Sequence, residues 1–139
     1  MPIPADDDLA DLVRSALARH CGGPAISAIY LFGSVATGQS TPQSDLDIAV
    51  LSPRQLPEAA LFEAGLDLGR DTGRDVDLLD LRRASTVLAT QVVAHGRRIS
   101  VTDRFAADRF DAETFSEYAT LAERRAAAIA AFRERYRDG

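Results

Sequence analysis

The sequence contains no lysine and a single cysteine, and each shortage excludes a class of function. Without lysine there is neither a P-loop lysine nor a lysine that could form a Schiff base. Cys21 alone cannot form an internal disulfide or a thiolate metal cluster, which favours a reducing compartment. No apolar run approaches the roughly 20 residues of a membrane span, and the acidic first residues carry no apolar signal segment. We therefore expect a cytoplasmic protein with no membrane partner.

The charge that is present is mostly negative. All 16 basic residues are arginine, 21 residues are acidic, and the formal net charge is −5. A net negative domain is a poor partner for duplex nucleic acid, which rewards a basic face, so we expect no direct contact with nucleic acid. The length of 139 residues and the hydrophobic fraction of 46% are those of one domain with its own core, spanning 1–139.

Hydrophobic periodicity predicts alternating helices and strands. Helices are expected over about 6–20, 56–68, 85–94 and 103–137, and strands over about 26–32, 45–51, 76–81 and, as a short edge strand, 98–101. The segment 33–44 is rich in Gly, Ser, Thr, Gln and Pro, which indicates a loop with one helical turn at 35–37. This order predicts an α/β (α+β) fold with a small sheet and a helical C-terminus.

The strand 45–51 carries two carboxylates on one face. Asp45 and Asp47 are two residues apart, so both side chains point to the same side of the strand. Two adjacent carboxylates repel each other and are relieved by a shared proton, a cation or full exposure. Asp77 lies in a second acidic strand and would join them if the two strands are neighbours. Three such carboxylates could hold two Mg²⁺ or Mn²⁺ ions for a phosphoryl or nucleotidyl transfer; solvated strand-end residues are the alternative.

Gly33 and Ser34 follow the strand 26–32 directly. At this position backbone N–H groups and a hydroxyl could contact a triphosphate, and glycine permits a close approach. The spacing Gly33-Ser34, ten residues, then Asp45-x-Asp47, followed later by Asp77, resembles the minimal nucleotidyltransferases of the polymerase-β superfamily. It is most similar to the MntA-type antitoxins that are paired with a HEPN-domain RNase toxin. The motifs cover about 26–81, and the helical segment of about 103–137 also fits.

The resemblance implies a small mixed sheet of the polymerase-β type and Mg²⁺-dependent transfer of AMP from ATP to a tyrosine hydroxyl of a cognate HEPN toxin. In this reading two Mg²⁺ ions are bound, Gly33 and Ser34 hold the ATP phosphates, and Asp45, Asp47 and Asp77 ligate the metal. Asp77 would also help to deprotonate the tyrosine. Many members have a basic residue at the position of Thr37. A hetero-oligomer with the toxin is the expected assembly.

Two other functions fit the same residues. One is a nucleotidyltransferase for a small molecule of the antibiotic type, although the roughly 60 residues after Asp77 leave little room for a substrate domain. The other is an antitoxin without catalysis that occludes its partner. The residues do not decide the nucleotide, the acceptor or the stoichiometry.

Three further features remain interpretations from the sequence alone. Because there is no lysine, cationic help for a triphosphate must come from arginine, and Arg82 and Arg83 are the first candidates, with Arg54 a weaker one. Asp80 should point away from Asp77 in a regular strand. The apolar stripe from Tyr118 to Tyr136 is expected to be core, with partner binding as the alternative.

Overall fold

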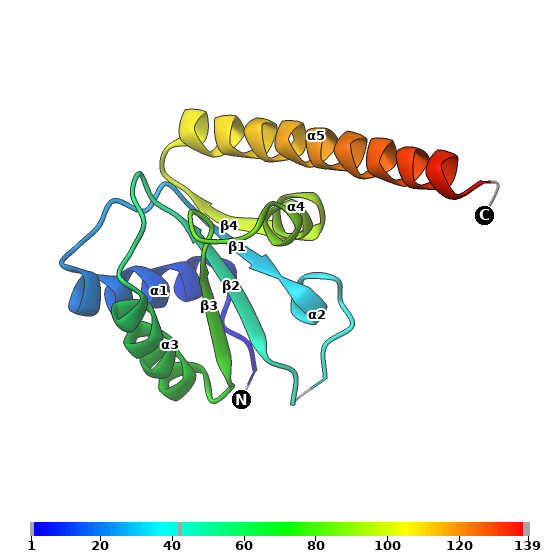
Figure 1. The fold of residues 1–139 in the computed structure, drawn as a ribbon. Helices are drawn as coiled ribbons and strands as arrows, with labels where there is room; N and C mark the ends of the chain where they lie inside the picture. The colour runs from blue at the N-terminus through cyan, green and yellow to red at the C-terminus, as the bar shows by residue number, and fades with distance from the viewer. Residues whose placement is uncertain (1, 42, 138–139) are drawn as a thin grey trace.

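The computed structural model describes residues 2–41 and 43–137 (Figure 1). Its elements follow the predicted alternation: α1 (Asp6–Cys21), β1 (Ala28–Phe32), α2 (Gly33–Ala36), β2 (Leu46–Leu51), α3 (Glu58–Thr72), β3 (Val76–Asp80), α4 (Thr86–His95), β4 (Arg97–Val101) and α5 (Arg104–Tyr136). The α/β prediction is confirmed, and the one helical turn in the loop begins at Gly33 instead of residue 35.

The four strands form one mixed sheet in the order β3-β2-β1-β4. β1 pairs antiparallel with both β2 and β4, whereas β2 and β3 are parallel. The predicted edge strand β4 therefore lies at one edge, and β3 lies at the other. Because β2 and β3 are neighbours, the two acidic strands of the sequence lie side by side, as the carboxylate site requires.

Helices cover both faces of the sheet (Figure 1). On one face α1 and α3 pack against alternate strand residues, with Leu46, Ile48 and Val50 of β2 in that core. On the other face α4 and the start of α5 pack against the intervening residues, among them Ala49 and Leu51. The alternation of the strand thus assigns each side chain of β2 to a known face.

Helix α3 continues through the predicted break at Gly69 and ends at Gly73. A side chain at position 69 would bring its Cβ to 3.2 Å from the carbonyl oxygen of Arg74, so glycine lets the chain reverse closely against the helix. Gly73 then takes the left-handed conformation, with φ of +69°, that commonly closes helices. The glycines here shape the turn into β3 and do not break α3.

Helix α5 is anchored to the sheet near its beginning. The hydroxyl of Tyr30 donates to Asp111 at 2.8 Å, and Arg98 donates to the other oxygen of Asp111 at 2.7 Å. The helix then passes α4 and projects beyond it at its C-terminal end, and Tyr118, Phe132 and Tyr136 are exposed (Figure 1). The prediction that the stripe from Tyr118 to Tyr136 is core is wrong, because the sheet ends before the helix does. Among the described residues, none of the helices is both long and apolar enough to cross a membrane.

Candidate active site

Asp47 and Asp77 face each other across the parallel pair of β2 and β3, where their Cα positions are in register. Asp45 directly precedes β2 and shares the side of the sheet that Asp47 occupies. This side carries Ala49 and Leu51 further along β2, under α4. Asp45 and Asp77 are exposed and Asp47 is half-buried, so the structure gathers all three predicted carboxylates at the N-terminal ends of two adjacent strands.

Gly33 and Ser34 lie beside this group. Phe32, the last residue of β1, pairs with Asp47, and the chain turns at Gly33 with a φ of +74°. A Cβ at Gly33 would lie 3.1 Å from Cγ of Asp47 and closer still to Oδ2. The backbone at Gly33 is therefore in contact with the Asp47 carboxylate, and a side chain at position 33 would displace that carboxylate. The predicted phosphate-binding turn thus adjoins the predicted metal ligand Asp47.

The short helix α2 begins at Gly33 and includes the half-buried Ser34. The hydroxyl of Thr37 bonds to the carbonyl oxygens of Ser34 at 3.2 Å and of Gly33 at 3.4 Å. Thr37 thus closes the helical turn through local contacts with the backbone.

The carboxylates carry more negative charge than their surroundings neutralise. Burial raises the pKa of the Asp47 carboxyl, and the negative charges of Asp77 and then Asp45 raise it further. Among residues 2–41 and 43–137, no ion pair involves Asp45, Asp47 or Asp77. The cluster therefore has the electrostatic character of a site that gains from a cation.

The donor chemistry of this cluster fits Mg²⁺ or Mn²⁺, which prefer hard carboxylate oxygens. Within the described part of the chain, however, no three Asp, Glu, His or Cys side chains are already arranged as ligands around one ion. Asp45, Asp47 and Asp77 therefore gather at one end of β2 and β3 without forming a completed ligand set. The assignment of Asp45, Asp47 and Asp77 as metal ligands stays a prediction on that account.

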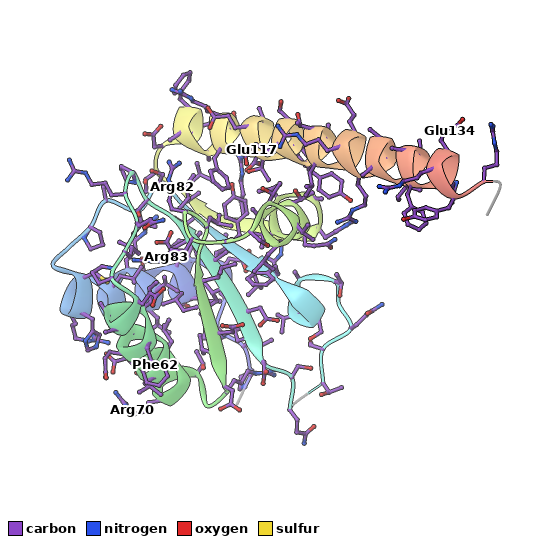
Figure 2. All side chains as sticks on the ribbon, viewed as in Figure 1. Phe62, Arg70, Arg82, Arg83, Glu117 and Glu134 are labelled. Atoms are coloured by element: carbon purple, nitrogen blue, oxygen red, sulfur yellow. The ribbon has the colours of Figure 1, made fainter. Side chains whose placement is uncertain are left out.

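Arg82 and Arg83 lie at the opposite ends of the strands from the carboxylates (Figure 2). β3 runs from Val76 to Asp80, so both arginines are roughly 10 Å or more from Asp77 at about 3.3 Å per residue. The interpretation of Arg82 and Arg83 as triphosphate ligands is therefore wrong.

Both arginines instead donate to backbone. Nε of Arg82 bonds to the Ser52 carbonyl oxygen, and Nε of Arg83 bonds to the Leu56 carbonyl oxygen, each at 2.9 Å. Arg54 lies exposed beyond the same end of β2, equally far from the site.

Asp80 points away from Asp77, as predicted, and is buried. Its two carboxylate oxygens accept from the backbone N–H of Leu56 at 2.7 Å and of Arg82 at 2.9 Å. A buried carboxylate needs such donors, and Asp80 uses them to fix the connection between β2 and α3. It takes no part in the site.

The chain matches a known protein family over most of its length. The family model described as Polymerase beta, Nucleotidyltransferase matches residues 16–105, which include every carboxylate of the site. The chain belongs to this nucleotidyltransferase family.

Individual proteins of known function and structure are also similar to this chain. The chain is 42% identical over 106 residues, 76% of either protein, to protein adenylyltransferase MntA of Shewanella oneidensis. A chain in the crystal structure of a toxin–antitoxin with AMP-PNP matches at 36% identity with a TM-score of 0.78, covering 91% of this chain and 97% of that one. A chain in the structure of a tri-AMPylated Shewanella oneidensis HEPN toxin in complex with MNT antitoxin matches at 35% identity with a TM-score of 0.72. The match covers 91% of this chain and 94% of that one. This nucleotidyltransferase is thus a homologue of MntA.

Sequence reasoning missed Arg74, which lies in the turn before β3 of this nucleotidyltransferase. Its guanidinium contacts the backbone of the segment that leads into Asp45. In the sequence Arg74 is one of several arginines beside a glycine, and its partners are some 30 residues away. Only the parallel pairing of β2 and β3 brings the two segments together, so no local pattern could have identified it.

Proposed function

We propose that this chain transfers AMP from ATP to a tyrosine hydroxyl of a cognate HEPN-domain toxin and thereby neutralises the toxin. The proposal rests above all on the register of Asp47 with Asp77 beside Gly33 and Ser34, in a homologue of a protein adenylyltransferase. Solved complexes of an MNT antitoxin with a HEPN toxin, and of a toxin–antitoxin with AMP-PNP, support the partner and the nucleotide. A stable hetero-oligomer with the toxin follows from the same comparison.

In the proposed reaction the phenol oxygen forms a bond to the α-phosphorus of ATP, and the bond from that phosphorus to the bridging oxygen of pyrophosphate breaks. Tyrosine then carries AMP, and pyrophosphate leaves with the displaced electron pair. A phenol with a pKa near 10 is a weak nucleophile while it is protonated. Asp77 is exposed beside Asp47 and would accept the phenol proton.

The other site residues are proposed to bind either the divalent cations or the ATP phosphates. Asp45 and Asp47 would hold divalent cations, together with Asp77, and Mg²⁺ is the natural candidate because its ligands are hard oxygens. Held by these carboxylates, such ions would supply positive charge to offset the negative charge that develops during transfer. The backbone of Gly33 and the hydroxyl of Ser34, both in the short helix α2, would contact the ATP phosphates.

The decisive experiment uses the chain purified together with its cognate HEPN toxin. Addition of Mg²⁺ and ATP is expected to increase the mass of the toxin by AMP, and the double variant Asp45→Asn/Asp47→Asn is expected to abolish the increment. Relief of toxicity by the double variant without any mass increase would show occlusion instead. Transfer of AMP to a small molecule in place of the toxin would also overturn the proposal.

A further inference from the structure

Arg74 joins the two strand ends that carry the candidate ligands. It lies between the end of α3 and the start of β3, and Nη1 donates to the carbonyl oxygen of Ser44 at 3.1 Å and to that of Thr41 at 3.3 Å. Its Nε is buried and has no hydrogen-bond partner within the described residues. Arg74 is therefore directed inward, to backbone, and not toward solvent as most arginines of this chain are.

Thr41 and Ser44, whose carbonyls Arg74 contacts, are also bonded to each other. The N–H of Ser44 donates to the Thr41 carbonyl at 3.0 Å, and the Ser44 hydroxyl accepts from the N–H of Thr41 at 2.7 Å. Arg74 binds both carbonyls, so it fixes Thr41 and Ser44 together. Ser44 is the residue immediately before Asp45.

Asp45 is thus fixed from both sides although it lies outside β2. On its N-terminal side the Ser44 carbonyl is held by Arg74. On its C-terminal side the N–H of Leu46 donates to the carbonyl of Asp75 at 2.8 Å. Both partners come from the segment that enters β3, so the backbone of Asp45 is tied to the strand that presents Asp77. Without the Arg74 contact, only the second of these ties would remain.

The charge of Arg74 is kept off the carboxylates. Arg74, Asp45, Asp75 and Asp77 all line one open groove of about 1030 Å³. An ion pair between Arg74 and one of these carboxylates would compete with a metal ion for the same oxygens. Within the described chain Arg74 makes no such pair, and its Nη1 is bound to carbonyl oxygens instead.

We propose that Arg74 is a positioning residue for the nucleotidyl transfer, and that it holds the backbone carbonyls of Thr41 and Ser44 so that the Asp45 carboxylate is presented to the divalent cation. The inference rests on the proposed function of Asp45, Asp47 and Asp77. Nη1 carries both contacts, so loss of the guanidinium removes both, whereas lysine keeps the charge on a side chain of different length and geometry.

The test measures Mn²⁺ binding to the purified chain by titration calorimetry, with no reaction taking place. Arg74→Gln is expected to weaken Mn²⁺ binding about tenfold, and Arg74→Lys, which keeps the charge and guards against misfolding, about threefold. Arg54→Gln is the matched control, since it removes the same charge from the opposite end of β2. Circular dichroism establishes that each variant is folded.

A double-mutant cycle separates positioning from general stability. Once Asp45→Asn is present, Arg74→Gln should cause no further loss of Mn²⁺ affinity, because the carboxylate that it positions is gone. The inference is overturned if Arg74→Gln and Arg74→Lys bind Mn²⁺ as tightly as the wild type does, or if Arg54→Gln weakens Mn²⁺ binding as much as Arg74→Gln does. It is also overturned if the losses of Mn²⁺ affinity from Arg74→Gln and Asp45→Asn simply add in the double variant. Should Asp45→Asn/Asp47→Asn leave Mn²⁺ binding unchanged, the proposed metal site itself is wrong and this inference falls with it.

Discussion

Gly33 and Asp47 are in direct contact: a Cβ at position 33 would lie 3.1 Å from Cγ of the Asp47 carboxylate and closer to its Oδ2. The φ of +74° at Gly33 adds a second reason for glycine. A residue of the phosphate-binding turn thus limits where a candidate metal ligand can point. In the chain, ten residues separate Gly33-Ser34 from Asp45. The contact between Gly33 and Asp47 brings these two halves of the nucleotidyltransferase motif together in space.

Gly33→Ala is expected to reduce AMP transfer about 100-fold, because the added methyl group displaces the Asp47 carboxylate and small misplacements are costly in catalysis. The measurement is the initial rate of AMP incorporation into the toxin. Gly38→Ala is the matched control, since Gly38 has a similar φ of +76° but no atom within 4 Å of the added Cβ. Equal losses in the two variants would show that backbone strain, and not the contact with Asp47, is responsible.

Asp47→Asn is expected to abolish transfer and yet raise the melting temperature of the metal-free protein by a few degrees. Burial and the charges of Asp77 and Asp45 raise the pKa of Asp47, so its ionised form destabilises the folded chain at neutral pH. Thermal unfolding in EDTA at pH 7 checks this. Asp11→Asn, an exposed carboxylate on α1, should leave the melting temperature unchanged. A lower melting temperature for Asp47→Asn would contradict the repulsion argument.

Arg83→Ala is expected to lower the free energy of unfolding by about 1–2 kcal/mol, because a buried carbonyl loses a charged donor. The KM for ATP is expected to stay within twofold of the wild type. Arg83 donates to the Leu56 carbonyl and lies 3.9 Å from the buried Asp80. Urea unfolding and steady-state kinetics measure the two quantities. A large rise in KM with unchanged stability would return Arg83 to the list of triphosphate ligands.

Asp67 should make stability fall on acidification. His20 and Arg19 of α1, together with Arg70, contact its carboxylate. The His20 hydrogen bond first, and then Arg19, hold the pKa of Asp67 below its usual value. A depressed folded-state pKa contributes stability above the unfolded pKa of about 3.9, which is lost as pH falls through the folded value. Urea unfolding between pH 6 and pH 3 should therefore show that the free energy of unfolding falls less steeply with decreasing pH in Asp67→Asn than in the wild type. An unchanged slope would show that the α1–α3 contact is not electrostatic.

Local patterns were sufficient for most of the fold and for the candidate residues. The two-residue period places Asp45 and Asp47 on one side of a strand whatever surrounds it, and the same rule turns Asp80 away from Asp77. The strand β1 and the turn at Gly33 follow from a buried apolar run that ends in glycine. The chain's membership of the polymerase-β family was visible in these motifs because their spacing is short range.

Errors arose where a residue's role depends on distant segments. Arg82 and Arg83 follow Asp77 closely in the sequence, but β3 carries them to the far end of the sheet. The stripe on α5 has the period of a core helix, yet its second half extends beyond the sheet, so Phe132 and Tyr136 remain exposed. Periodicity reports that a face is apolar, and only the size of the neighbouring layer decides whether it is covered.

The sequence by itself determined the carboxylate motif, the order of helices and strands, and the family, since these depend on residue type and on spacings of a few residues. The tertiary structure decided that β3 lies parallel to β2, so that Asp77 meets Asp47. It also decided that Arg74 reaches back to Ser44 from 30 residues away. Such relationships depend on which strands become neighbours, and that choice is made by the burial of the whole core and not by any local segment.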